Sequence, residues 1–201
     1  MDALVMCGGR GTRLDADTEK PLYDIDGRPM VDRVIDALRA SRIEAIHAVG
    51  SSNAPRTRDR LDPGRSDVSR DGTRRCGPHV ESFVETPGKG YVTDLAAALD
   101  SIDLPVLTVV ADLPLLTGES VDRVIDAFEG DSLAVCVPVT LKRALGVSVD
   151  TTMEHEGRTV APTGINVVGT GDAETTLVSH DERLAVNVNR RADAQVAEAL
   201  A

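Results

Sequence analysis

Residues 1–22 read "MDALVMCGGRGTRLDADTEKPL", an apolar run followed at once by three glycines and two arginines. Glycine lets backbone N–H groups approach anionic oxygens closely, and arginine offers fork-shaped donors that suit phosphates. Ten residues beyond Arg10 stands Lys20, beside the stiffening Pro21. Arg10, Arg13 and Lys20 would together neutralise much of a triphosphate. The stretch therefore predicts an anion-binding turn after a first buried strand, with a tight turn and solvated arginines as the alternative.

Two better-known glycine loops do not fit this stretch. A P-loop requires the pattern GxxxxGK[ST], and a dinucleotide-binding turn requires GxGxxG. No lysine follows the last glycine of the run, and position 14 is leucine. The turn is therefore expected to be neither a P-loop nor a dinucleotide-binding turn.

Apolar runs of strand length alternate with helix-period segments along the chain. The apolar runs are mostly continuous and β-branched, as buried parallel strands are. This alternation predicts an α/β fold, a Rossmann-like three-layer arrangement with a mostly parallel central sheet and helices on both faces. Residues 1–201 are expected to form a single domain. The predicted strands lie at 3–6, 45–50, 79–85, 105–111, 133–139, 164–169 and 184–189, and the predicted helices at 29–41, 91–101, 118–130 and 191–200.

Two segments interrupt the alternation. Residues 51–78 are polar and punctuated by glycine and proline, which predicts a short helix followed by a mobile surface loop. Residues 140–160 show no clear periodicity and are expected to be irregular. Neither segment is repetitive or of low complexity.

The composition narrows the partners of the chain. The formal net charge is −11, with 33 acidic residues against 22 basic ones, of which only three are lysines. Such a surface repels polynucleotides, so no nucleic-acid partner is expected. The Asp-rich, Lys-poor bias resembles proteins of salt-accumulating halophiles, in which salt screens the self-repulsion. An ordinary acidic mesophile protein is the alternative.

The cysteines and apolar runs indicate the compartment. Cys7, Cys76 and Cys136 are odd in number, far apart and without zinc-site spacing, which favours a reduced cytoplasmic chain. No run approaches the ~20 apolar residues of a membrane span, and residues 3–7 are too short a run for a signal peptide. Cys7 is expected to be a small buried residue rather than a nucleophile. None of the four histidines has a triad-like setting in the sequence.

A second motif, "TVVADLPLLT" at residues 108–117, ends an apolar strand at Asp112. Open α/β sheets bind ligands outside the carboxyl ends of their strands, and a carboxylate there suits Mg²⁺. Asn187 and Asn189 alternate within "LAVNVN" and are candidates for the second metal ligand, Asn189 first and Asn187 as the fallback. Helix capping is the alternative for all three residues.

A third motif, "ETPGKGYVTDL" at residues 85–95, follows a predicted strand and opens a predicted helix. Gly88 and Gly90 flank Lys89 within it. A glycine-rich helix start with a lysine favours anion binding, so these three residues are predicted to contact a nucleotide.

The first stretch resembles the signature GGxGTRL…EKP of the nucleotidyltransferase superfamily, which joins a nucleoside triphosphate to a phosphorylated acceptor. The resemblance implies that the turn wraps the triphosphate and that Lys20 contacts phosphate during transfer. It also implies that the strand-end Asp112 binds Mg²⁺ and that an Asp or Asn near the final helix lies opposite. The turn and its following residues implied to bind nucleotide are Gly8, Gly9, Arg10, Gly11, Thr12, Arg13 and Lys20.

With "PGKGYVTDL", "SSNAPRT" and "PTGINVV", the chain is more narrowly similar to the archaeal GTP:adenosylcobinamide-phosphate guanylyltransferases of cobalamin assembly. That resemblance implies GTP and a phosphorylated corrinoid acceptor as substrates, Mg²⁺ as cofactor, and catalytic roles for Lys20, Arg13 and Arg10. Two departures are Cys7, where alanine is usual, and a long arginine-containing loop at 62–78. A molybdopterin or sugar 1-phosphate acceptor, and a catalytically silent nucleotide-binding protein, remain as alternatives. The chain is expected to be a monomer or a homodimer.

Overall fold

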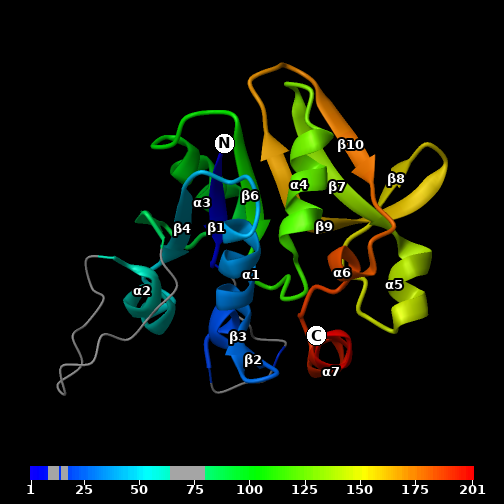
Figure 1. Ribbon diagram of the computed structural model, residues 1–201, viewed down its shortest axis with the longest axis horizontal. Helices are drawn as coiled ribbons and strands as arrows, with labels where there is room; N and C mark the ends of the chain where they lie inside the picture. The colour runs from blue at the N-terminus through cyan, green and yellow to red at the C-terminus, as the bar shows by residue number, and fades with distance from the viewer. Residues whose placement is uncertain (9–13, 15–17, 64–79) are drawn as a thin grey trace.

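The computed structural model describes residues 1–8, 14, 18–63 and 80–201 (Figure 1). An eight-stranded sheet has the strand order β10-β7-β9-β6-β1-β4-β5, with β8 paired to β9. The strands are β1 (Asp2–Met6), β4 (Ile46–Ser51), β5 (Ser82–Thr86), β6 (Val106–Val110), β7 (Ser132–Pro138), β8 (Met153–His155), β9 (Arg158–Val168) and β10 (Glu174–Val178), and β2 (Asp24–Ile25) pairs with β3 (Arg28–Pro29) in a separate two-stranded sheet.

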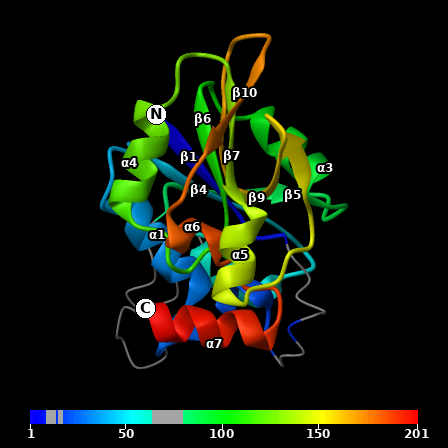
Figure 2. The ribbon, with the colours of Figure 1, turned by 90° about the vertical axis from the view of Figure 1, so that its right-hand side faces the viewer.

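The helices cover both faces of the sheet, as Figure 2 shows with α1 and α4 on one side of the strands and α3 on the other. The four neighbouring strands β6, β1, β4 and β5 run parallel to one another, and β10 runs parallel to β7. Strand β9 lies between β6 and β7 and is antiparallel to both. The prediction of a mostly parallel, three-layer α/β fold is therefore confirmed. The helices are η1 (Lys20–Leu22, a 3-10 turn), α1 (Met30–Arg39), α2 (Pro55–Leu61), α3 (Tyr91–Leu99), α4 (Gly118–Asp126), α5 (Val139–Leu145), α6 (Glu182–Ala185) and α7 (Arg191–Leu200).

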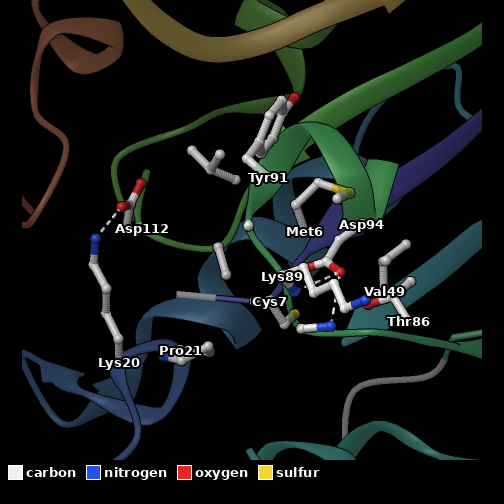
Figure 3. A pocket seen from close by; sticks show the side chains of 15 residues that line it. Met6, Cys7, Lys20, Pro21, Val49, Thr86, Lys89, Tyr91, Asp94 and Asp112 are labelled. Atoms are coloured by element: carbon white, nitrogen blue, oxygen red, sulfur yellow. Dashed lines mark hydrogen bonds and ion pairs between the residues drawn. The ribbon is translucent and has the colours of Figure 1, made fainter. Parts of the chain in front are cut away.

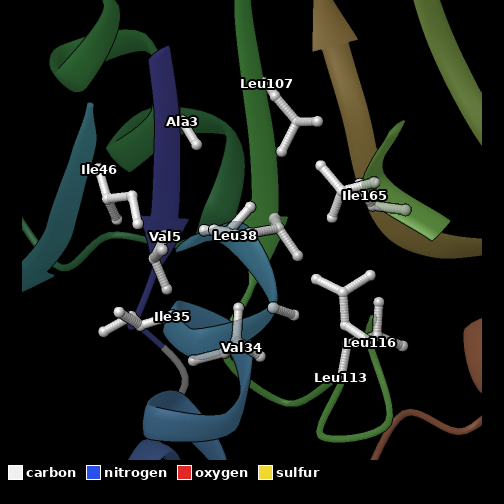
Figure 4. Packing of buried hydrophobic residues seen from close by; sticks show 14 of the residues in the cluster. Ala3, Val5, Val34, Ile35, Leu38, Ile46, Leu107, Leu113, Leu116 and Ile165 are labelled. Carbon is white, nitrogen blue, oxygen red and sulfur yellow. The ribbon is translucent and has the colours of Figure 1, made fainter. Parts of the chain in front are cut away.

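The first strand is buried on both faces because its side chains alternate between two apolar layers. Ala3 and Val5 pack in the layer that includes α1 residues, and Figure 4 shows Val34 and Leu38 among them. Leu4 and Met6 point to the opposite layer, which includes Ala98 of α3. A strand buried on both sides reads as a continuous apolar run, which is why residues 3–6 were recognisable.

The expectation for residues 140–160 is wrong, and one strand of the sheet has no counterpart among the predicted strands. Residues 140–160 are not irregular throughout: α5 begins at Val139, and β8 and the start of β9 follow. A seven-residue helix ended by a left-handed Gly146 is too short to give a readable period. The edge strand β10 was also not anticipated, because its sequence "ETTLV" has little apolar character.

The predicted strand at 184–189 is also wrong. Residues 182–185 form the short α6, and residues 186–189 belong to no strand. Val186 and Val188 alternate because both are buried in a cluster that includes Ala194 and Ala197 of α7, not because they pair in a sheet. The amide of Val188 makes a single backbone hydrogen bond, 2.9 Å long, to the carbonyl of Asp112.

The predicted short helix within 51–78 is confirmed as α2. Of the predicted loop at 62–78, the structure describes only residues 62 and 63, and residues 64–78 lie outside the described residues. In the part of the chain that the structure describes, no helix has the length and apolar character needed to cross a bilayer.

Helix α7 is anchored at its first turn by the buried carboxylate of Asp193. This carboxylate accepts hydrogen bonds from the backbone N–H groups of Asn189 and Arg190, at 3.0 and 2.9 Å. It also accepts from the backbone N–H and the hydroxyl of Ser148, at 2.7 and 2.8 Å. One side chain therefore joins the start of α7 to the segment that follows α5.

We expect Asp193→Ala to lower the free energy of unfolding by about 2–4 kcal/mol, because four donors lose a charged acceptor in a buried position. Asp193→Asn keeps the shape and one acceptor oxygen, so it should cost less. Urea denaturation of the three proteins measures the difference. A loss below about 0.5 kcal/mol in the alanine variant would contradict this anchoring role.

Cys7 follows β1 and is 1% exposed. Burial raises the pKa of the Cys7 thiol to about 12. The thiolate is the reactive form, so the folded protein keeps this cysteine unreactive near neutral pH. This agrees with the expectation that Cys7 is a packing residue rather than a nucleophile.

We therefore expect iodoacetamide at pH 8 to leave Cys7 unmodified in the folded protein, because a thiol with a pKa near 12 is roughly one ten-thousandth ionised there. The alkylation rate should rise about tenfold per pH unit from this low level. Peptide mass spectrometry measures labelling at Cys7 alone, with the guanidinium-unfolded protein as the fully reactive control. Labelling of native Cys7 at the rate of the unfolded control would refute its burial.

Candidate active site

A cavity of about 660 Å³ opens at the carboxyl ends of the parallel strands (Figure 3). Its walls come from the end of β1, the end of β6, the segment after β5 and η1. These are the places where an open α/β sheet holds its ligands. The lining includes Gly8, Lys20, Gly88, Lys89, Gly90 and Asp112, all of which the sequence predicts to be site residues.

The ammonium group of Lys20 lies between two oxygens from distant parts of the chain. It forms an ion pair with Asp112 Oδ2, drawn as a dashed line in Figure 3, and donates to Asn189 Oδ1 at 2.6 Å. The side chains of Lys20 and Asp112 are only 13% and 17% exposed. The structure thus brings together the predicted phosphate-binding lysine and the first-choice pair of metal ligands.

The oxygens of Asp112 and Asn189 have the chemistry that Mg²⁺ requires. Both are hard donors, and both converge on one cation, here the ammonium of Lys20. No group of three or more Asp, Glu, His or Cys side chains that could hold a metal ion exists among the described residues. Mg²⁺ usually takes one or two protein oxygens and completes its shell with water and substrate phosphates, so this pair fits such a metal.

Asn187 is oriented differently from Asn189. Its side-chain amide donates to the carbonyl of Thr163 at 2.8 Å and to Asp112 Oδ1 at 3.4 Å. Its Oδ1 accepts a 3.2 Å hydrogen bond from Lys142. The amide nitrogen of Asn187, not its oxygen, therefore faces Asp112, and this geometry favours Asn189 over Asn187 as the metal ligand.

Lys142 lies beneath this site on α5 and was not singled out from the sequence. Its side chain donates to the carbonyl of Ala185 at 2.6 Å as well as to Asn187. Burial lowers the pKa of Lys142, and the nearby carboxylates of Asp193, Asp112 and Asp150 oppose that shift. The sequence does contain a sign of its importance, because only three lysines occur in the chain and this one stands within an apolar stretch.

The loop after β5 is shaped by glycine and by Asp94. Gly88 has φ +67°, and a Cβ there would lie 2.4 Å from the amide nitrogen of Asn53. The buried carboxylate of Asp94 accepts from the backbone N–H groups of Gly88 and Lys89, at 2.8 and 3.3 Å. The glycine turn does open α3 as predicted, but Asp94 already occupies two of the N–H groups expected to face an anion.

Glu19 holds the short turn that carries Lys20. Its two carboxylate oxygens accept from the backbone N–H groups of Arg56 and Thr57, at 2.9 and 2.7 Å, and from the Thr57 hydroxyl at 2.6 Å. These bonds join η1 to the first turn of α2. The lysine is thus fixed through its neighbour in the sequence as well as through its own ammonium group.

His47 has a more triad-like setting than the sequence suggested. Its Nδ1 lies 2.8 Å from the Ser82 hydroxyl, and its Nε2 lies 3.5 Å from Asp2 Oδ2, which is long for a hydrogen bond. The three residues stand at or near the starts of parallel strands, on the edge of the sheet opposite the cavity. These neighbours are not evident in the sequence, and His47 is remote from the site.

The core of the predicted triphosphate turn lies outside the described residues. This applies to Gly9, Arg10, Gly11, Thr12 and Arg13. Gly8 is described, and a Cβ there would lie 3.3 Å from Asp94 Oδ2. The turn therefore begins against the same carboxylate that shapes the loop after β5.

Comparison with known proteins gives the site its family context. Residues 3–149 match the family of the MobA-like NTP transferase domain. An adenosylcobinamide-phosphate guanylyltransferase from Methanocaldococcus jannaschii is 30% identical over 210 residues, covering 100% of this chain and 97% of that protein. The bifunctional protein GlmU from Maricaulis maris is also 30% identical, but over 131 residues that cover 64% of this chain and 26% of GlmU.

Solved structures share the fold at lower identity. A putative glucose-1-phosphate thymidylyltransferase from Bacillus anthracis aligns with a TM-score of 0.66 at 14% identity, covering 100% of this chain and 94% of that one. A hypothetical transferase from Thermus thermophilus gives a TM-score of 0.59 at 24% identity, covering 84% and 64%. The sequence motifs, the position of the cavity and the sequence matches all indicate the same family. The chain belongs to the MobA-like NTP transferase family and is a nucleotidyltransferase.

Proposed function

We propose that this nucleotidyltransferase transfers GMP from GTP to adenosylcobinamide phosphate, giving adenosylcobinamide-GDP and pyrophosphate in cobalamin biosynthesis. The observation that carries this proposal is the match to the Methanocaldococcus jannaschii enzyme over 100% of this chain and 97% of that protein. The match to GlmU leaves about a third of this chain and most of GlmU uncovered. Full-length similarity favours the first acceptor over a sugar phosphate.

The proposed reaction requires no general base. A phosphate-monoester oxygen of the acceptor is already ionised near neutral pH and can attack the α-phosphorus of GTP directly. The new P–O bond forms as the bond to pyrophosphate breaks, and the leaving group departs with the electron pair. The protein then acts by alignment and by neutralising charge on the transferring group.

Lys20 has the position to supply that charge. In the structure its ammonium is paired with Asp112 and Asn189. When GTP binds, we propose that the α-phosphate replaces Asp112 as the partner of Lys20, while Arg10 and Arg13 hold the β- and γ-phosphates. Asp112 and Asn189 would hold Mg²⁺, whose charge would offset that of the phosphates.

The proposal extends to the nucleotide contacts, the salt conditions and the location of the protein. Gly88, Lys89 and Gly90 line the cavity and are proposed to contact the nucleotide. The acidic, lysine-poor composition supports assays at high KCl, as for a protein of a halophilic archaeon. A cytoplasmic location is proposed from the composition, with buried free thiols at Cys7 and Cys136.

We expect Lys20→Ala to lower kcat by at least ~100-fold, because one preorganised donor to the transferring phosphate is lost. Steady-state pyrophosphate release with GTP and acceptor measures the effect. Arg39→Ala removes an exposed cation from the end of α1 and is the matched control, which should stay near the wild-type rate. Near-normal turnover in the Lys20 variant would rule out the proposed role.

The substrates are tested by pyrophosphate release from each of the four nucleoside triphosphates against a panel of phosphorylated acceptors, with Mg²⁺ and high KCl. Release with GTP only when adenosylcobinamide phosphate is present supports the proposal. Release with UTP and a sugar 1-phosphate, or with GTP and molybdopterin, would assign the site to another acceptor. No release with any pair, from protein that still binds GTP, would identify a silent nucleotide-binding protein.

A further inference from the structure

A buried lysine needs a structural reason, because removing an ammonium group from water is costly. Lys142 is 4% exposed, and its side chain donates to the carbonyl of Ala185 at 2.6 Å and to Asn187 Oδ1 at 3.2 Å. Ala185 is the last residue of α6, and Asn187 lies in the segment between α6 and α7, which also carries Asn189. Lys142 therefore acts on the C-terminal part of the chain that carries Asn189, and it is not itself among the residues that line the cavity.

The orientation of Asn187 follows from partners at both ends of its amide. An Asn side chain offers an acceptor oxygen and a donor nitrogen, and the network around it sets which end faces which neighbour. Here the nitrogen meets two acceptors, Thr163 O and Asp112 Oδ1, and the oxygen meets the Lys142 ammonium. A reversed amide would place oxygen against oxygen at Asp112 and nitrogen against ammonium at Lys142.

This orientation has a consequence for Asp112. Its Oδ1 is engaged by Asn187, and its Oδ2 faces the ammonium of Lys20. The oxygen of Asn187 is withheld from that cation position, so the amide oxygen found there is that of Asn189. Asn189 presents its oxygen to the cation position, whereas Asn187 donates to Asp112. This difference depends on the donor that occupies Asn187 Oδ1.

We propose that Lys142 is a positioning residue, whose buried side chain holds the oxygen of Asn187 away from the site so that Asp112 and Asn189 alone present oxygens to the cation position. The catalytic consequence rests on the proposed function, whereas the orientation of Asn187 does not. Without Lys142, Asn187 Oδ1 loses its charged donor, and the amide is held only through its nitrogen, by Thr163 O and Asp112 Oδ1. Asp112 then has a less firmly held partner, and the carboxylate becomes less well placed for the transferring group.

The first test reads the orientation directly and needs no substrate. We expect proton exchange of the Asn187 side-chain NH₂ group, followed by ¹H–¹⁵N NMR, to become at least ~10-fold faster in Lys142→Met than in the wild type. Arg143→Met removes an exposed cation from the same helix and is the matched control, with exchange at the wild-type rate. Unchanged Asn187 exchange in a folded Lys142→Met protein overturns the proposal.

If the methionine variant does not fold, Lys142→Gln tests the same point. Its side chain is one bond shorter, so it cannot span to Asn187 while it stays in the same place. Faster Asn187 exchange in this variant supports the positioning role. Exchange equal to that of the wild type overturns it.

The second test separates positioning from a general structural effect by a double-mutant cycle. We expect Lys142→Met to lower kcat for pyrophosphate release ~10- to 100-fold with a smaller change in KM for GTP, as is typical when a partner behind a ligand is removed. In an Asn187→Ala background the same substitution should change kcat by less than ~2-fold, because its effect passes through Asn187. Independent, multiplicative losses in the double variant would overturn the proposal.

The two tests also distinguish failure of this role from failure of the proposed function. If the wild type releases no pyrophosphate with any acceptor, the proposed function fails, and the NMR exchange still decides the role of Lys142. If the wild type is active and Asn187 exchange is unaffected by Lys142→Met, the positioning role fails alone.

Discussion

The ammonium group of Lys20 holds together three parts of the chain that are distant in sequence. It bonds to Asp112 after β6 and to Asn189 ahead of α7. A carboxylate and an amide oxygen that face one another in a partly buried position are unfavourable unless a donor or cation lies between them. The side-chain oxygens of Asp112 and Asn189 can therefore face one another because the positive charge of Lys20 lies between them.

Each member of this arrangement is held by contacts outside it. Glu19 ties the turn of Lys20 to α2 through three hydrogen bonds, and Asp193 ties the backbone of Asn189 to the start of α7. The backbone bond from Val188 to Asp112 fixes the distance between the two oxygen-bearing segments. Groups held in this way need little rearrangement when charge develops on a transferring phosphate, which is the main source of catalysis in such reactions.

The sequence reveals the parts of this site that depend on local pattern. Asp112 was found because it ends an apolar strand, and Lys20 because it stands at a set distance from a glycine turn. Asn189 ranks ahead of Asn187 only through its position before the final helix, because the alternation at 184–189 reports burial beneath α7 and not a strand.

The sequence did not reveal the residues whose roles depend on partners far along the chain. Lys142 meets its acceptors 43 and 45 residues away, and Glu19 meets its donors 37 and 38 residues away. Asp94 is a different case, since it reads as an ordinary acidic residue in the first turn of a helix until the loop that it binds is seen. The fold is more predictable than the site because the layers follow from the spacing of apolar residues, which can be read within short stretches of sequence.

Salt affects the exposed ion pairs of this chain and the ion pair of its candidate site differently. With a net charge of −11, the surface repels itself, and salt relieves that repulsion by screening exposed charges. Exposed pairs such as Arg42 with Asp126, at 53% and 66% side-chain exposure, are screened by the same salt. Lys20 and Asp112 are mostly shielded from solvent, and buried pairs are screened much less. A site built on shielded charges therefore keeps its electrostatic order under the salt concentrations that most favour the acidic surface.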